Sequence, residues 1–163
     1  MNNTLTTRWS RFGAALLGAA AALFGGAAIA AAPINTLEPG FFGGRGDVAI
    51  LGYDTVAYFT EGKAVKGHDS YVTEWMGAKW KFASKSNLDR FKAQPARYAP
   101  QYGGYCAYGV SQGYLVKVEP DQFKIISDKL YLNFDASVQA KWLQDPAGYI
   151  RIADSKFPAL LNK

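Results

Sequence analysis

The chain contains a single cysteine, Cys106, so its fold cannot be stabilised by an internal disulfide. A small domain of this kind depends on a densely packed apolar core, and aromatic residues, which make up 15% of the chain, can provide it. The cysteine lies in a stretch with two glycines, which permit a tight turn, and three tyrosines: Pro100-Gln101-Tyr102-Gly103-Gly104-Tyr105-Cys106-Ala107-Tyr108. We therefore expect the thiol just after a turn, surrounded by phenolic side chains.

Residues 1–30 have the pattern of an export signal peptide. A polar start carries Arg8 and Arg11 and no acidic residue, and an apolar run rich in Ala, Leu and Gly follows it. The run ends in Ala28-Ile29-Ala30, a small-x-small sequence that predicts cleavage after Ala30 and a periplasmic or secreted protein. An apolar run of about 18 residues is also the lower limit of a spanning helix, so a retained membrane anchor is the alternative.

The charge pattern argues against one class of partner. The net charge of +5 becomes +3 when Arg8 and Arg11 leave with the signal, and basic and acidic residues are interspersed. A nucleic-acid-binding groove is therefore not expected. Export would place the protein in an oxidising compartment, where a lone thiol is a candidate ligand, a reactive group or the source of an intermolecular disulfide through Cys106.

The sequence after the signal divides into a leader, one domain and a tail. Residues 31–47 are interrupted by Pro and Gly and predict a flexible leader, in which Phe41 and Phe42 either dock in a groove or belong to a mobile segment. Residues 48–158 are long enough for one domain with its own core, and residues 159–163 form the tail. No repeat is visible after the signal.

Two hairpins, each followed by helices, are predicted along the domain. The elements of the first half are a helical turn over 55–59 capped by Asp54, strands over 71–76 and 79–82 around a Gly77-Ala78 turn, and a helix capped by Ser84 or Ser86 and ended by Pro95. Those of the second half are a strand over 114–118, strands over 124–127 and 130–134 around an Asp128-Lys129 turn, a helix capped by Asp135 or Ser137, and a last helix after Pro146 with Tyr149, Ile150, Ala153 and Phe157 on one face. The fold class is therefore α+β, a small single domain of antiparallel β-hairpins with short helices packed against them.

These residues carry a resemblance to a known family. The hairpin and helix from Tyr71 to Tyr98 resemble the YHS domain, through Gly77, Trp80-Lys81-Phe82, Ser84, Phe91, Pro95 and Tyr98. The wider region from Val48 to Phe157 is similar to the exported bacterial branch of that family, through residues 52–59, 98–107 and 130–133. The resemblance implies a relationship to proteins in which a small hairpin-helix unit binds metal through cysteines. Their cysteine positions align near Ala83 and Asn87, so any metal in this protein would need another ligand set.

Cys106 and His68 are the candidate ligands for a metal ion or small ligand. Thiolate with imidazole suits Cu(I) or Zn(II), and Asp54 or Asp69 could add a carboxylate. The residues expected to line a pocket with the thiol are Tyr53, Asp54, Tyr58, Tyr102, Gly103, Gly104, Tyr105 and Tyr108. Buried tyrosines with hydrogen-bonded hydroxyls would give the same pattern, and Asp54 is better suited to cap a helix than to act as an acid catalyst.

The function predicted from these residues is that of a monomeric exported binding domain, with no catalysis expected. The first alternative is a thiol-redox protein, because a helix that starts at Cys106 could lower the pKa of the thiol. The second is a purely structural or interaction module, in which Cys106 is a small core residue.

Overall fold

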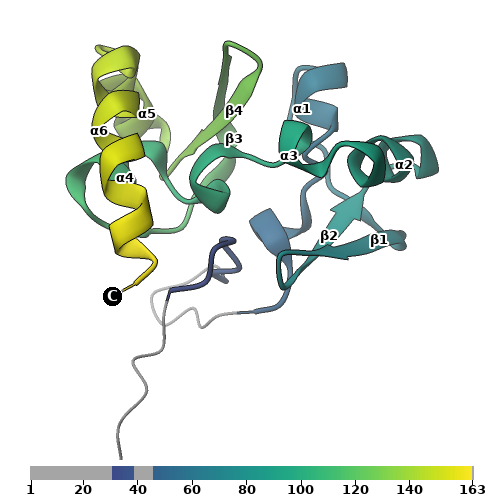
Figure 1. The fold of residues 1–163 in the computed structure, drawn as a ribbon. Helices are drawn as coiled ribbons and strands as arrows, with labels where there is room; N and C mark the ends of the chain where they lie inside the picture. Colours follow the sequence, from purple (N-terminus) through teal and green to yellow (C-terminus); the bar gives the residue numbers. More distant parts are fainter. Residues whose placement is uncertain (1–30, 39–45, 163) are drawn as a thin grey trace, which may run out of the picture.

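The computed structural model describes residues 31–38 and 46–162 and has an α+β fold, as predicted (Figure 1). Two antiparallel hairpins form separate two-stranded sheets, and short helices pack around each of them. The elements in chain order are η1 (Ala49–Gly52), α1 (Ala57–Thr60), β1 (His68–Trp75), β2 (Ala78–Phe82), α2 (Lys85–Ala93), α3 (Pro95–Tyr98), η2 (Gln101–Gly104), α4 (Ala107–Gln112), β3 (Glu119–Ile126), β4 (Lys129–Asn133), α5 (Ala136–Trp142) and α6 (Pro146–Leu160).

This order contains a structural repeat, which corrects the expectation of none. A 3₁₀ turn, a short helix, a hairpin and two helices occur once in residues 49–98 and again in residues 101–160. We call these segments the first and the second unit. In Figure 1 they form two lobes, with β1, β2, α1, α2 and α3 in one and β3, β4, α4, α5 and α6 in the other.

The backbone angles of the two 3₁₀ turns show that the units correspond residue by residue. Residues 50–52 have φ values of 49°, 55° and 77°, and residues 102–104, which lie 52 positions later, have values of 56°, 61° and 83°. The next N–H closes each turn in the same way, from Tyr53 to the carbonyl of Ile50 and from Tyr105 to that of Tyr102, both at 3.1 Å. Left-handed backbone is rare for side chains other than glycine, so its recurrence in this order is a specific match.

The two hairpins match as well. Each has a two-residue turn with positive φ at both positions, Met76-Gly77 in the first unit and Ser127-Asp128 in the second, as a type I′ turn requires. Both turns lie one residue earlier than the sequence suggested, because Gly77 and Asp128 occupy the second central positions of their turns and not the first. Each first strand also carries a register shift near its start.

Helix caps follow the sequence closely. Ser84, Asp135 and Asp145 each accept a backbone N–H from the first turn of α2, α5 and α6, and the first two of these caps were predicted.

The strand predicted over 114–118 is wrong. That segment is an extended connection without a strand partner, and the carbonyl of Val116 accepts the N–H of Cys106 at 3.3 Å.

Leader residues 31–38 connect the two units at their 3₁₀ turns (dark blue in Figure 1). The N–H of Asn35 donates to the carbonyl of Gly103 at 2.8 Å, and its Nδ2 donates to that of Gly104 at 2.9 Å. The carbonyl of Asn35 accepts the N–H of Ile50 at 3.1 Å, and Asn35 is buried. One leader residue therefore bonds both η1 and η2. Phe41 and Phe42 lie outside the described residues.

Candidate functional site

Cys106 caps α4 from the interior of the second unit. Its side chain is 1% exposed, and Sγ accepts the N–H of Gly109 at 3.3 Å. Sγ also lies 3.8 Å from Oδ1 of Asn133, the buried last residue of β4, and that oxygen accepts the N–H of Tyr108 at 3.4 Å. The thiol thus holds the start of α4 against the end of β4.

Asp54 occupies the corresponding position in the first unit. Its Oδ1 accepts the N–H groups of Val56 and Ala57 at 2.9 and 3.2 Å, so the predicted cap is confirmed. Its Oδ2 accepts the N–H of Ala83 at 2.8 Å and Nδ2 of Asn87 at 2.7 Å. The carboxylate is fully buried and ties α1 to the end of the hairpin and to α2.

The contacts of Cys106 repeat those of Asp54. Both residues donate their own N–H to a valine carbonyl in the segment before the hairpin, Val65 for Asp54 and Val116 for Cys106. The N–H of Phe134, the residue just after β4, also bonds to the thiol, as the N–H of the residue just after β2 bonds to Asp54. Cys106 is therefore the second unit's version of a structural link that a carboxylate makes in the first.

Burial raises the pKa of the Cys106 thiol above its ordinary value. The N–H groups of Gly109, Phe134 and Tyr108 act in the opposite direction, but desolvation is the larger effect. The helix start that was predicted at Cys106 is present, whereas the lowered pKa expected from it is not. α4 is only six residues long, and the thiol that caps it is kept from water.

Because the thiol is buried and protonated, we predict that Cys106 does not react with Ellman's reagent in the native protein and reacts fully in urea. Replacement of Cys106 by alanine is expected to lower the free energy of unfolding by about 1–3 kcal/mol, through the lost volume and the lost cap. Urea denaturation measures this loss. Rapid labelling of the folded protein would contradict the structural role and would favour the thiol-redox alternative.

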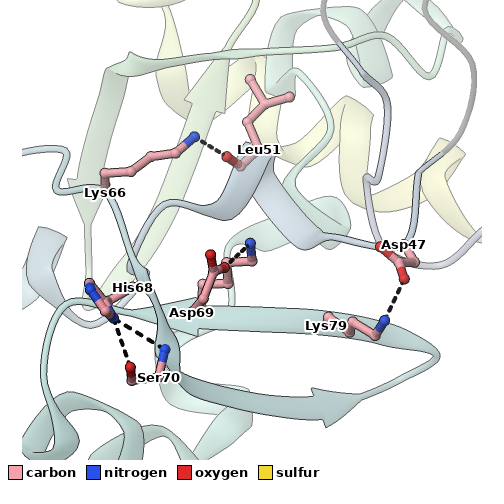
Figure 2. Close-up of polar contacts among 8 residues, drawn as sticks. Asp47, Leu51, Lys66, His68, Asp69, Ser70 and Lys79 are labelled. Atoms are coloured by element: carbon pink, nitrogen blue, oxygen red, sulfur yellow. Dashed lines mark hydrogen bonds and ion pairs between the residues drawn. The ribbon is translucent and has the colours of Figure 1, made fainter.

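His68 lies in the first unit, at the start of β1, and is exposed (Figure 2). Its Nδ1 is 3.1 Å from Oγ of Ser70 and accepts the N–H of Ser70 at 3.2 Å. Asp69 forms an ion pair with Lys81 at 2.5 Å. Among residues 31–38 and 46–162, no group of three or more His, Cys, Asp or Glu side chains could hold a metal ion. Metal binding by Cys106 and His68 stays a prediction.

The tyrosines expected around Cys106 mostly bond to other parts of the chain. The hydroxyl of Tyr58 donates to the carbonyl of Pro120 at 2.9 Å, and that of Tyr105 donates to the carbonyl of Ala32 at 3.1 Å. The other predicted lining residues are Tyr53 beneath Lys66, Tyr102 bonded to Asp154, Tyr108 against Tyr149, and Gly103 and Gly104 against the leader. That all of them line one pocket with Cys106 stays a prediction.

A polar cleft of about 340 Å³ lies beside β1, β2 and η1 in the first unit (the region of Figure 2). Opposite charges line it in equal number, with Glu38 and Asp69 facing Lys66 and Lys81. Lys66 Nζ donates to the carbonyl of Leu51 at 2.5 Å, and Lys81 forms an ion pair with Asp69. Three of the four charged side chains in this cleft therefore already bond within the protein.

A second cleft, between the β3–β4 hairpin and α6, is larger and mostly apolar. Its volume is about 650 Å³. The residues that line it are Ile126, Ser127, Lys129, Tyr131, Pro146, Ala147, Ile150, Arg151 and Asp154. Volumes of about 300–1,000 Å³ with mostly apolar walls are typical of small-molecule sites.

The repeat explains why this cleft is open. Trp75 ends β1 and pairs with Ala78, and its ring packs on Trp80 and Phe91 with centroids 5.6 and 5.8 Å apart. In the second unit Ile126 ends β3 in the same register, so a side chain without an indole ring stands at that position. A cleft of the first unit that shares two of these positions, with Trp75 for Ile126 and Pro95 for Pro146, has about 200 Å³.

No motif in the sequence marks the residues of this cleft. Tyr131 follows Trp80 by 51 positions and packs on Trp142 as Trp80 packs on Phe91, with centroids 5.4 and 5.0 Å apart. Alignment of the second hairpin on the first would have shown large indoles replaced by Ile126 and Tyr131. That substitution is the sequence signal for the cleft.

Alkaline pH is expected to destabilise the fold. Burial raises the pKa of the Cys106 thiol and of the Tyr58, Tyr102 and Tyr131 hydroxyls, whose ordinary values are 9.0 and 10.0. The unfolded chain loses these protons at the ordinary values while the folded chain keeps them, so stability is complete below about pH 9 and falls as pH rises further. Urea denaturation between pH 7 and 11 measures the trend. Constant stability from pH 8 to 11 would contradict it.

Comparison with known proteins relates one part of the chain to a family. Within the part of the chain that the structure describes, no helix has the length and apolar character needed to cross a bilayer. No curated protein and no solved structure matches the chain. The family model of the YHS domain matches residues 56–102. This segment begins just before α1 and continues through β1, β2, α2 and α3 into η2. The first unit of this chain therefore carries a match to the YHS domain.

Proposed function

We propose that the protein is a non-catalytic binding domain that holds a small organic molecule in the cleft between β3–β4 and α6. The observation that carries the proposal is the difference between two clefts that share the matched positions Ile126/Trp75 and Pro146/Pro95, with about 650 Å³ in the second unit and about 200 Å³ in the first. Apolar side chains are normally packed to high density in a fold of this size. An enlarged apolar opening in one of two corresponding units supports a role in binding.

The proposal places the ligand away from Cys106. The thiol is buried, capped against Gly109 and does not line this cleft. Soft-metal binding at Cys106 remains a separate prediction, and titration of the mature protein with Cu(I) and Zn(II) tests it. Equal affinity of wild type and Cys106→Ser would remove it.

A variant that closes the cleft tests the proposal. Ile126→Trp places in the second unit the side chain that the first unit has at Trp75, and it should occupy the open volume. Ile152→Trp is the control, because Ile152 is exposed on α6 and does not line the cleft. The probe is N-phenyl-1-naphthylamine, an uncharged fluorescent dye.

Wild type and Ile152→Trp should bind the dye with equal affinity, and Ile126→Trp should weaken binding at least about tenfold, as expected when an apolar side chain takes the ligand's place. Thermal melts establish that each variant is folded. Equal binding by Ile126→Trp and wild type, or no binding by any of the three, would overturn the proposed function.

We also propose that the protein is exported, on the pattern of residues 1–30. These residues lie outside the described part of the chain, so the support is the sequence alone. Sequencing the amino terminus of the protein from a periplasmic or culture fraction tests it. A mature chain that begins at Ala31 is expected, and a chain that keeps residues 1–30 in the membrane fraction would favour the anchor.

A further inference from the structure

We infer that the cleft of the second unit is selective for organic anions with an apolar ring system. This inference rests on the proposed function and adds the chemical class of the ligand. It is carried by the charged groups at the edge of the cleft, by the tyrosine hydroxyl in its lining and by the absence of a cation at the position of the first unit that matches Lys129.

Two cations at the edge of the cleft have no acidic partner within the described residues. Lys129 at the start of β4 and Arg151 on α6 are both exposed, and neither forms an ion pair. Several other lysines are neutralised, as shown by Lys79 with Asp47 at 2.7 Å and Lys85 with Asp89 at 2.6 Å. The positive charge at the cleft is therefore available to a ligand.

The one carboxylate among the lining residues is already engaged. Oδ1 of Asp154 accepts the hydroxyl of Tyr102 at 2.9 Å, and that hydroxyl also lies 3.3 Å from the carbonyl of Ile150. Two cations face this single acid, so the lining carries a net positive charge. Attraction of an anion is the expected electrostatic consequence.

Tyr131 adds a polar group to a mostly apolar lining. The residue is 3% exposed and lines the cleft, so its hydroxyl is a hydrogen-bond donor that a ligand in the cleft can meet. An acidic oxygen of a ligand would accept this hydroxyl while Ile126 and Ile150 contact the ligand's rings.

The positive edge is specific to the second unit. Lys129 pairs with Ile126 across the turn, and the residue in the same place in the first unit is Ala78, which pairs with Trp75 and is buried. At this one cross-strand pair, the second unit therefore has a smaller side chain, Ile126, and a cation, Lys129. An amphipathic anion needs both differences, because its rings need space and its acidic group needs a positive charge.

A matched pair of dyes separates charge from shape. 1-Anilinonaphthalene-8-sulfonate has the ring system of N-phenyl-1-naphthylamine and differs from it by the sulfonate group. The wild-type protein should bind the sulfonate more than about tenfold tighter than the neutral dye, since exposed ion pairs contribute up to about 1 kcal/mol each and two are available.

Lys129→Gln and Arg151→Gln test the source of that preference. Each should weaken sulfonate binding by up to about fivefold and leave the neutral dye unchanged, and the double variant should bind both dyes within about twofold of each other. Arg90→Gln, an exposed change on α2 of the first unit, controls for net charge. Added salt should weaken only the sulfonate.

The outcomes distinguish this inference from the proposed function. Equal binding of the two dyes, abolished by Ile126→Trp, would overturn the anion preference and leave the binding cleft intact. A preference that Arg90→Gln reduces as much as Arg151→Gln does would also overturn it, because the effect would then be general to the protein's charge. Failure of both dyes to bind would overturn the proposed function itself.

Discussion

Replacement of Asp54 by alanine is expected to lower the free energy of unfolding by about 3–5 kcal/mol, the largest effect of any single change considered for this chain. The carboxylate is fully buried and accepts four hydrogen bonds, from the backbone of Val56, Ala57 and Ala83 and from the side chain of Asn87. Alanine would leave all four donors without an acceptor inside the protein. Urea denaturation monitored by tryptophan fluorescence measures the loss.

Asp135→Ala is the matched control for this prediction. Asp135 also caps a helix, through the N–H of Val138 at 2.8 Å, and its other hydrogen bonds come from the exposed Ser137. Loss of such a cap costs about 1 kcal/mol. If Asp54→Ala costs no more than Asp135→Ala, Asp54 is an ordinary cap and the link between α1, the hairpin and α2 does not depend on it.

Replacement of Gly103 by alanine is expected to have the next largest effect, about 2–4 kcal/mol. A Cβ at this position would overlap the carbonyl oxygen of Pro33, and the φ of +61° is strained for a residue with a side chain. The leader must then move away from η2. Hydrogen exchange reports this directly, because the amides of Asn35 and Ile50 should lose protection.

Gly113→Ala separates the cost of backbone strain from the cost of a clash with the leader. Gly113 also has a positive φ, +94°, but a Cβ there would meet no atom within 4 Å. Only the backbone cost of about 1 kcal/mol is expected, with Asn35 still protected. Equal losses for both glycine variants, with unchanged exchange at Asn35, would show that the leader does not depend on Gly103.

Local signals predicted the elements of this fold well. Caps and turns are set by neighbouring residues, so the Asp54 and Ser84 caps and both hairpins could be found from a few positions each. The strand expected over 114–118 was wrong because that prediction also used neighbouring residues alone. A strand needs a partner, and the composition of a segment does not say whether one is present.

The repeat escaped prediction because it is preserved in backbone geometry and packing and only weakly in residue identity. Asp54 and Cys106 have the same position and similar contacts, but they share neither charge nor size. The 3₁₀ turns use Ile50 where the second unit has Tyr102, with φ values of 49° and 56°. A chain can keep a conformation while it changes the side chains that adopt it.

The candidate site could not be predicted from motifs for a related reason. The sequence drew attention to Cys106 as a rare residue, and rarity does not report burial. The cleft arises instead from a difference in side-chain size between Trp75 and Ile126, which becomes visible only when the two hairpins are compared. Both residues are ordinary in a strand.

The repeated order of elements has an evolutionary interpretation. A unit of about 50 residues buries too little apolar surface to be stable alone, so an ancestral single unit would have needed a second copy beside it. Duplication and fusion of such a unit would account for the repeat, because each half then has its second copy in the same chain. The first unit has Trp75 where the second has Ile126, so two halves of one chain differ in how tightly they pack while they keep the same order of elements.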